Sequence, residues 1–485
     1  MIRKDYFFTS NKMSKKNIVI IGGGWAGIMS ARVLTDYTDK FNIYLIEKEP
    51  TIGGISNSEF TDQCIIEYSW RVYFDEYYLV NQMLHDSNIY TDLCKVQDTI
   101  LVDGISNKSF MEKLKMTYLE YMDYFKWPVG LRIKMMYVYM LPDFMLYPLY
   151  KNTIAYDYFD KDPFIAVLIG PILGFEVAKT NLYTFVKRIR DSKRIATKWQ
   201  VSSHAPHRFI FTAILEFLQR KKVLVKTGTT VTKIENRIVY TSAGKIKADE
   251  IILACTLGTL DILPTHTPTL IIEKLQALKK YGSQNYLALN FYFSEPLGPD
   301  NNYILMNQPW FPIIETKRLS GWIDDIRQFC KPQIKEVWNV GVSDYLPSKN
   351  GKILYQCTLD QAIAETVEQV ATDAFIKKLK TPTGKTFAQV FLRAEAHSFW
   401  LKKGKLQSKY PKFCPNVKTM DELLDYTYPE FDNFYFCGYY CMPTGQYGMA
   451  METSAYTGVM TAQKLLQNYD LELPPVYKEI VEEKY

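Results

Sequence analysis

The chain has 485 residues, which is long for one hydrophobic core, so two interleaved domains are expected. Hydrophobic residues make up 47% and charged residues 23%, as in globular proteins, and no run of about 18 apolar residues predicts a membrane span. A formal charge of only +6 argues against a nucleic-acid-binding protein. The aromatic share of 15% indicates either large apolar cavities and surfaces or an AT-rich codon bias.

The ends of the chain and its cysteines bear on location. Residues 1–13 lack the apolar core of a signal peptide and are expected to form a flexible extension. The eight cysteines form no CxxC pair and no metal-type spacing, so we expect reduced thiols in a cytoplasmic protein and no metal site. They lie at positions 64, 94, 255, 330, 357, 414, 437 and 441.

A βαβ unit is predicted immediately after the extension. Asn17–Ile21 is an apolar, β-branched run, and three glycines follow it at once. Helical spacing runs from Trp25 to Asp36, and a second apolar strand, Ile43–Ile46, ends at Glu47.

The turn of this unit carries a dinucleotide fingerprint, Gly22-x-Gly24-x-x-Gly27. The first glycine permits a tight turn, the second lets a pyrophosphate approach the backbone, and the third lets helix and strand pack closely. The helix N-terminus offers amides to the phosphates. Glu47 follows Gly27 by 20 residues, where a carboxylate accepts bonds from both ribose hydroxyls and repels the 2′-phosphate of NADP.

Further elements follow along the chain. Residues 85–200 are rich in Met, Tyr and Phe, with helical spacing around Phe110–Phe125. Predicted helices cover Ala205–Leu218, Leu359–Leu379 and Ala450–Leu466. Predicted strands cover Val223–Val225, Val231–Ile234, Ile238–Tyr240, Ile251–Ala254, 286–293 and Phe434–Phe436.

Three features point to FAD rather than NAD. A second glycine pair, Gly53 and Gly54, follows Glu47 and lets another backbone segment touch the dinucleotide. The stretch 223–256 has an inserted hairpin and a returning buried strand, and the chain closes with FYFCGYYCMPTGQYGMAMETSAYTGVMTAQKLL over 434–466. In this order the segments resemble the flavin-containing amine oxidase and phytoene desaturase superfamily.

The resemblance implies an α/β protein in which a Rossmann-like FAD-binding domain, split in sequence, is interleaved with an α+β substrate domain. The FAD-binding domain is expected to comprise 14–80, 202–265 and 425–468, and the substrate domain 81–201 and 266–424. Residues 469–485 are polar, contain a Pro-Pro break and are expected to form a peripheral tail.

The resemblance also implies roles for single residues. The backbone of Val231 faces the adenine, Gly438 approaches the ribityl phosphate, and Met451, Glu452 and Thr453 present helix N-terminal amides to the flavin. A helix N-terminus stabilises the negative charge of reduced flavin, which supports the last role. Two positions depart from the family, since Ile55 replaces an arginine and Tyr439 an acid. Cys414 does not match a covalent attachment site, so FAD is expected to bind non-covalently.

The substrate prediction rests on one position. Amine oxidases place a tyrosine immediately before the Met-Glu pair, whereas this chain has Ala450, a small residue of the kind that carotenoid and isoprenoid desaturases use. The nearest tyrosine before it, Tyr447, lies three residues ahead of this position. This favours a lipophilic small-molecule substrate.

Two surface segments admit two interpretations each. Residues 135–150 are densely apolar but contain Pro142 and Asp143, so they form either helical core of the substrate domain or a peripheral contact with a bilayer. The basic stretch 187–198 forms either a solvated helix face or a contact with an anionic membrane or a phosphate-bearing ligand.

Other candidate groups are weaker. Arg71 pairs with Glu67 or faces the flavin and substrate pocket. His204 and His207 span a proline and a helix start, which argues against a metal pair. Cys437 and Cys441 are read as packed thiols rather than a redox pair.

The sequence thus predicts an FAD-dependent, desaturase-like oxidoreductase in which hydride passes from an apolar, isoprenoid or carotenoid-like substrate to flavin N5. An FAD-dependent amine oxidase is the first alternative. A flavin-binding structural protein without turnover is the second.

Overall fold

The computed structural model describes most of the chain. The described residues are 14–67, 73–74, 77–89, 93–95, 99–102, 127–162, 165–166, 169, 177–192, 199–202, 207–284, 286–297, 303–306, 308–310, 312–318, 329–343, 347–397, 399–402, 405–408, 412–413, 416–441 and 451–484. The predicted helical region around Phe110–Phe125 lies outside them.

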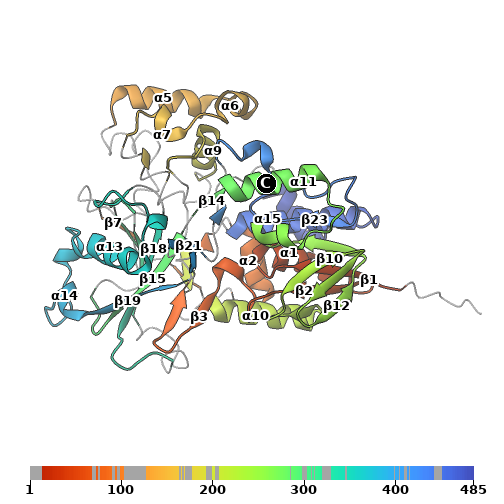
Figure 1. Ribbon diagram of the computed structural model, residues 1–485, viewed down its shortest axis with the longest axis horizontal. Helices are drawn as coiled ribbons and strands as arrows, with labels where there is room; N and C mark the ends of the chain where they lie inside the picture. The colour runs from red at the N-terminus through yellow and green to blue at the C-terminus, as the bar shows by residue number, and fades with distance from the viewer. Residues whose placement is uncertain are drawn as a thin grey trace, which may run out of the picture.

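A five-stranded parallel sheet organises one half of the molecule (Figure 1). Its order is β23-β13-β1-β2-β9, so strands from three distant parts of the chain lie side by side. These strands are β1 (Lys16–Ile21), β2 (Phe41–Ile46), β9 (Leu224–Lys226), β13 (Glu250–Leu253) and β23 (Phe434–Phe436). The mixed α/β fold and the Rossmann-like sheet predicted from the sequence are confirmed.

Both faces of this sheet are buried. Ile18 and Ile20 pack into one hydrophobic cluster, and Val19 and Ile21 pack into another, as the alternation of a strand requires. The first cluster includes residues of helices α1 (Trp25–Leu34), α2 (Tyr78–Asp86), α10 (His207–Arg220) and α15 (Met451–Gln467). The second includes residues of the hairpin sheet β10 (Val231–Glu235), β11 (Ile238–Thr241) and β12 (Gly244–Lys247) and of helix α11 (Thr269–Tyr281).

A six-stranded, mostly antiparallel sheet organises the other half, with α13 packed beside it (Figure 1). Its strand order is β19-β15-β18-β17-β16-β7. These strands are β7 (Thr99–Val102), β15 (Tyr286–Phe293), β16 (Tyr303–Met306), β17 (Ile313–Arg318), β18 (Glu336–Ser343) and β19 (Phe391–His397). Helix α13 (Leu359–Ala371) ends earlier than predicted, because Asp373 accepts a hydrogen bond from the Phe375 N–H and starts a turn.

Short strands and helices complete the described structure. Small sheets pair β3 (Ser58–Phe60) with β4 (Ile65–Glu67), β14 (Ser283–Gln284) with β22 (Lys412–Phe413), β20 (Phe399–Lys402) with β21 (Lys405–Ser408), and β8 (Trp199–Ser202) with both β5 (Tyr73–Phe74) and β6 (Leu93–Lys95). Four helices form a layer at one end of the molecule: α5 (Val129–Met140), α6 (Asp143–Tyr150), α7 (Ala155–Tyr158) and α9 (Leu182–Ser192) (Figure 1). Helix α14 spans Phe387–Val390. Within the described ranges, no helix is long and apolar enough to cross a bilayer.

The C-terminal residues correct one prediction. Instead of a peripheral tail, they form helix α16 (Pro475–Lys484), and the Tyr477 side chain is fully buried. Its hydroxyl donates to Asp86 at 3.2 Å, and Asp86 is also ion-paired with Arg32 of α1. This helix therefore docks on the parallel-sheet half through the Tyr477 ring, the shared carboxylate of Asp86 and the partly buried side chains of Val476, Ile480 and Val481.

The cysteines correct another prediction. Cys64 and Cys330 form a disulfide across 266 residues, so not all thiols are reduced. The backbone brings them together, because the Lys331 N–H donates to the Gln63 carbonyl at 2.8 Å. Cys437 and Cys441 are free and buried, which confirms their interpretation as packed thiols. Burial raises the pKa of Cys437 to about 12 and that of Cys441 well above its ordinary value.

The contact between α1 and α15 depends on a glycine that the sequence did not single out. A Cβ on Gly458 would lie 2.2 Å from the Ala26 carbonyl oxygen, so only glycine permits this approach. Ser30 strengthens it by donating to the Gly458 carbonyl at 2.9 Å.

We therefore expect Gly458→Ala to lower the free energy of unfolding by about 1–3 kcal/mol, because the added methyl must push the helices apart. Gly130→Ala is the matched control, since Gly130 is also helical and a Cβ there meets no atom within 4 Å. Chemical denaturation of both variants measures the difference. Equal stability of the two variants would contradict the close packing of α1 on α15.

Candidate active site

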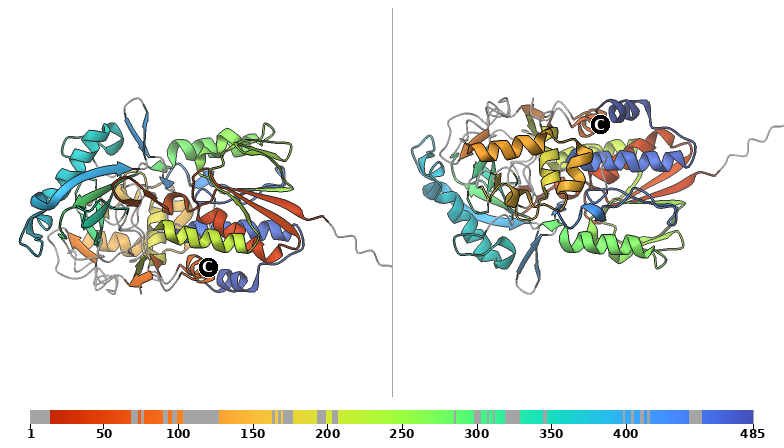
Figure 2. Two further views of the ribbon diagram at one scale, coloured as in Figure 1. Left: turned by 90° about the horizontal axis from the view of Figure 1, so that it is seen from below. Right: turned by 90° about the horizontal axis from the view of Figure 1, so that it is seen from above.

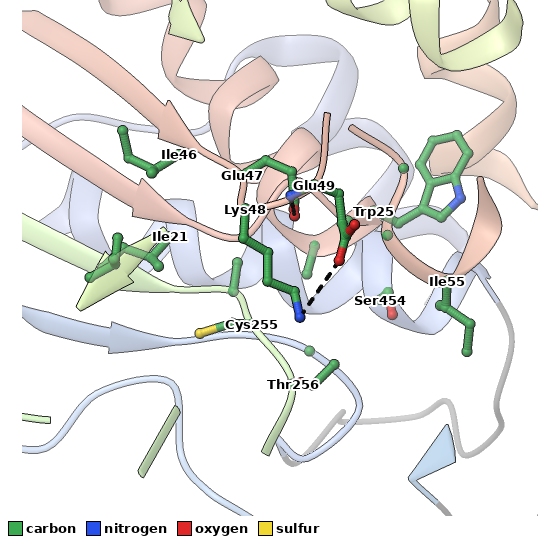
Figure 3. A pocket seen from close by; sticks show the side chains of 18 of the residues that line it. Ile21, Trp25, Ile46, Glu47, Lys48, Glu49, Ile55, Cys255, Thr256 and Ser454 are labelled. Carbon is green, nitrogen blue, oxygen red and sulfur yellow. Dashed lines mark hydrogen bonds and ion pairs between the residues drawn. The ribbon is translucent and has the colours of Figure 1, made fainter. Parts of the chain in front are cut away.

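A pocket of about 290 Å³ opens at the carboxyl ends of the parallel strands (Figure 3). This is the edge at which open α/β sheets bind ligands. The glycine turn after β1 and the segment that includes Gly438 line the same cavity. The lining residues come from the ends of β1, β2, β13 and β23, from the start of β10, and from α1 and α15.

The glycine turn is held against two strands. The Gly22 N–H donates to the Ile46 carbonyl at 2.8 Å. A Cβ on Gly22 would lie 2.5 Å from the Ala254 carbonyl oxygen, and one on Gly27 would lie 1.9 Å from the Gly22 carbonyl oxygen. Both positions therefore require glycine for packing. Gly24 differs, because a Cβ there meets no atom within 4 Å and would enter the pocket.

Helix α1 presents an uncapped N-terminus to this pocket. Gly24 is its N-cap, no side chain caps it, and its first turn contains no acid. The first N–H groups of a helix have no partners within the helix, and they carry the positive end of the helix dipole. The arrangement is suited to an anion such as a pyrophosphate.

Glu47 lies beside this turn and is only 7% exposed. Its carboxylate accepts hydrogen bonds from the Gly23 N–H at 2.7 Å and from the Glu49 N–H at 2.9 Å. Burial raises the pKa of Glu47, although these two bonds oppose the shift. At the rim, Lys48 lies 3.7 Å from the Glu49 carboxylate (Figure 3).

The second glycine pair also lies in the pocket. The Gly53 N–H donates to the Gly23 carbonyl at 2.7 Å, which ties the two glycine segments together. A Cβ on Gly54 would lie 3.2 Å from the Cα of Gly24. Val231, at the start of β10, is a further lining residue.

The C-terminal segment contributes Gly438 and Ser454 to the lining. The Gly438 N–H donates to the Thr457 hydroxyl of α15 at 2.9 Å, and Gly438 has a φ of 125°, which glycine adopts readily. Ile55 and Tyr439, the two departures from the family pattern, line the pocket as well.

Glu452 has a role that the sequence did not predict. Its buried carboxylate accepts hydrogen bonds from the Leu79 N–H at 2.7 Å and the Val80 N–H at 2.9 Å, so it caps helix α2. Met451 packs in the hydrophobic cluster around α1. Of the three residues predicted to face the flavin through their amides, none is among the lining residues, so that role stays a prediction.

Several lining residues were missed from the sequence. Thr229 and Thr230 precede β10, and Ala254, Cys255 and Thr256 follow β13. Their position in the sequence could have identified those that follow β13, because residues that follow a buried parallel strand lie at the ligand-binding edge of the sheet.

Some predicted residues lie outside the described ranges: Arg71, His204, Cys414, Tyr447 and Ala450. In the described part of the chain, no group of three or more His, Cys, Asp and Glu side chains is arranged to hold a metal ion.

The six-stranded sheet carries a buried polar row, formed by Asn290, Asn339 and Glu315, none of which is among the residues that line the pocket. These residues are directly opposite one another on β15, β18 and β17, so they share one face of the sheet. All three are at most 2% exposed. Asn339 donates to the Glu67 carbonyl of β4 at 2.7 Å, while its own oxygen and the Asn290 amide nitrogen have no partner among the described residues.

Comparisons with known proteins agree with this geometry. Residues 20–87 match the model of the NAD(P)-binding Rossmann-like domain, and residues 204–466, more than half of the chain, match that of flavin-containing amine oxidoreductases. The chain belongs to the flavin-containing amine oxidoreductase family. It is therefore an enzyme of the oxidoreductase class, and a structural role without turnover is set aside.

Solved structures of amine oxidoreductases share the fold over nearly the whole chain. Putrescine oxidase aligns with a TM-score of 0.63 and 11% identity, covering 94% of this chain and 99% of that chain. Cyclohexylamine oxidase from Brevibacterium oxydans aligns with a TM-score of 0.62 and 12% identity, covering 94% and 100%. At such identities the likeness concerns the fold alone.

Two curated proteins match short parts of the sequence. The carotenoid phi-ring synthase of Chlorobaculum tepidum is 34% identical over 104 residues, which are 19% of this chain and 16% of the relative. A heterodisulfide reductase iron-sulfur subunit from Methanopyrus kandleri is 46% identical over 54 residues, or 10% and 8% of the two chains. The matches thus span less than a fifth of either relative.

A flavin is the cofactor that family membership implies. The residues present fit such a group, because the uncapped helix, the open position beside Gly24 and the buried Glu47 surround one cavity.

We expect Gly24→Val to fold normally but to bind FAD more than 100-fold more weakly, because its Cβ would meet no protein atom within 4 Å and its side chain would occupy pocket space. FAD titration and thermal unfolding without FAD measure the two effects. Gly27→Val is the contrasting variant and is expected to lose stability, since its Cβ would overlap a carbonyl oxygen. Normal FAD affinity in Gly24→Val would refute the assignment of the pocket.

The raised pKa of Glu47 predicts a pH dependence of FAD binding. Hydroxyl donors favour the charged carboxylate, so bound FAD lowers this pKa and protonation opposes binding. Affinity is therefore full above the raised pKa and decreases as the pH falls through it. Fluorescence titration from about pH 8 to pH 5 measures this trend.

Glu47→Gln is the matched variant for the pH series. It is expected to bind FAD about 10–100-fold more weakly at neutral pH, because hydrogen bonds to a charged group contribute about 1.5–3 kcal/mol. Its affinity should depend little on pH. A wild-type-like pH profile in this variant would assign the dependence to another group.

Proposed function

We propose that the protein binds FAD non-covalently in this pocket and oxidises a largely apolar small molecule of isoprenoid or carotenoid type. The observation that carries the proposal is the shared cavity, in which the glycine turn, Glu47 and Gly438 are lining residues. When bound, the flavin supplies the hydride acceptor, its N5 atom.

Each part of the pocket has a proposed task. The amides at the start of α1 bind the pyrophosphate, and Glu47 accepts hydrogen bonds from the adenosine ribose. The Val231 backbone faces the adenine, Gly53 and Gly54 lie against the dinucleotide, and Gly438 approaches the ribityl phosphate.

The substrate class rests on two supports. The sequence has the small residue Ala450 at the position where amine oxidases of this family have a tyrosine. The sequence match to a carotenoid phi-ring synthase points the same way, although it covers 19% of the chain. A lipophilic substrate partitions into lipid, so the proposal includes the peripheral membrane contact expected at 135–150. The cytoplasmic location also stays a prediction, although the Cys64–Cys330 disulfide removes the expectation of reduced thiols on which it rested.

An FAD-dependent amine oxidase is the second candidate. The match of residues 204–466 to the model of flavin-containing amine oxidoreductases supports it.

Anaerobic reduction of the bound flavin distinguishes the candidates. Carotenoid and isoprenoid compounds in detergent micelles are expected to bleach the oxidised-flavin band, and polyamines and arylalkylamines are expected to leave it unchanged. Bleaching by amines alone would overturn the first candidate.

A further inference from the structure

The hairpin of α5 and α6 exposes an unusual number of large apolar side chains. The outward residues are Val129, Ile133, Met136, Tyr137, Met140, Phe144, Met145 and Leu149, which we call the apolar ridge. Phe144 and Met140, on either side of the bend at Pro142, are 78% and 77% exposed. No charged residue belongs to the ridge. Exposed apolar patches of this kind mark interaction sites.

The hairpin is not a misplaced piece of core, because it also has a separate buried face. Leu131, Met135 and Val138 of α5 and Leu146 of α6 are buried in the cluster that includes Phe185 of α9. Helix α5 therefore has two apolar stripes, one facing the protein and one facing outward. A helix that is apolar on both sides requires a second apolar environment.

Cations beneath the hairpin fix its shape. Arg190 of α9 donates to the carbonyls of Val138, Tyr139 and Leu141 at the end of α5, at 2.9, 2.6 and 2.5 Å. Asp143, in the first turn of α6, accepts from both Arg190 and Lys187. The bend at Pro142 is thus braced from the inner side, and the ridge is a fixed surface. In the view from above, the hairpin lies on the near side of the molecule (Figure 2).

Tyrosine hydroxyls connect the hairpin to the layer below. Tyr137 of α5 is hydrogen-bonded to Tyr150 at the end of α6, and Tyr150 to Tyr158 of α7. Burial and the neighbouring Tyr150 raise the pKa of Tyr158 to about 12, so it stays a neutral donor. Tyrosine, with an apolar ring and a polar tip, is enriched where lipid meets water.

Charge and chemistry separate a bilayer from a protein partner. From Trp127 to Lys151 the chain carries three basic residues and one acid. Lys134 and Lys151 are paired with Asp160 and Asp421, and Lys187 and Arg190 of α9 share the single acid, Asp143. With Arg132, the hairpin and its ion-pair partners have five bases and three acids, a net charge of +2. A protein interface forms about one hydrogen bond per 100–200 Å², whereas the ridge offers only the hydroxyl of Tyr137, which is already bonded.

We propose that the apolar ridge inserts into the interfacial layer of an anionic lipid bilayer, with Met140 and Phe144 at the deepest point. The contact is monotopic, with the two helices lying in the plane of the headgroups. The inference deepens the proposed function and rests on it for one point, the delivery of a lipophilic substrate from the membrane.

Vesicle flotation of the full-length, FAD-loaded protein tests the proposal. We expect the wild type to float with vesicles of phosphatidylcholine and phosphatidylglycerol, and more weakly with pure phosphatidylcholine. Met140→Glu/Phe144→Glu is expected to reduce flotation more than tenfold, and the milder Phe144→Asn to reduce it partially. Leu270→Glu, at an equally apolar position 50% exposed on α11, is the control and should float like the wild type. Retained flavin colour shows that each variant is folded.

Two outcomes would overturn the inference: a wild type that does not float, or a double variant that floats as well as the wild type. Sedimentation without lipid tests the alternative, a second copy of the chain on the ridge. A wild type that does not float but sediments as a dimer, with a double variant that sediments as a monomer, would assign the ridge to that second copy. Flotation requires no turnover. A protein that floats but is not bleached by lipophiles would therefore overturn the proposed substrate and leave the membrane contact standing.

Discussion

The close approach of the glycine turn to three parallel strands is the constraint on which the site depends. Gly22 lies against the end of β13, its N–H bonds to the end of β2, and Gly27 packs on Gly22 itself. This contact lets α1 begin directly at the sheet edge and directs its unpaired amides into the cavity. A side chain at Gly22 or Gly27 would move the helix away, and the anion site would be lost before any ligand was involved.

The buried carboxylates show how the same chemistry serves both binding and structure. Glu47 is held by two backbone N–H groups at the pocket, and Glu452 by two backbone N–H groups at the start of α2. Glu452 thereby fixes α15 to α2, and α15 packs closely on α1 through Gly458. The position of the C-terminal segment at the pocket therefore depends on contacts outside it. The family resemblance implied a role for the backbone amide of Glu452 and did not predict that its side chain caps α2.

Local patterns predicted what is local in the fold. The strands 286–293 and Phe434–Phe436 match residue for residue, and the glycine fingerprint lies where a strand-turn-helix pattern places it, because period and punctuation depend on neighbours in sequence. Contacts between segments that are distant in the sequence could not be predicted from local patterns. Tyr477 of the C-terminal helix reaches Asp86 of α2, and Cys64 is joined to Cys330 across 266 residues. Eight cysteines allow many pairings, and nothing in their spacing selects this one.

The pocket and the apolar ridge bear on the substrate in different ways. The pocket offers backbone amides and the buried carboxylate of Glu47, which suit the dinucleotide. The apolar ridge suits a molecule that enters from lipid, because its outward side chains carry no charge. A small, water-soluble amine would leave the ridge without a purpose in catalysis. The membrane contact therefore bears on the substrate class more directly than the pocket does.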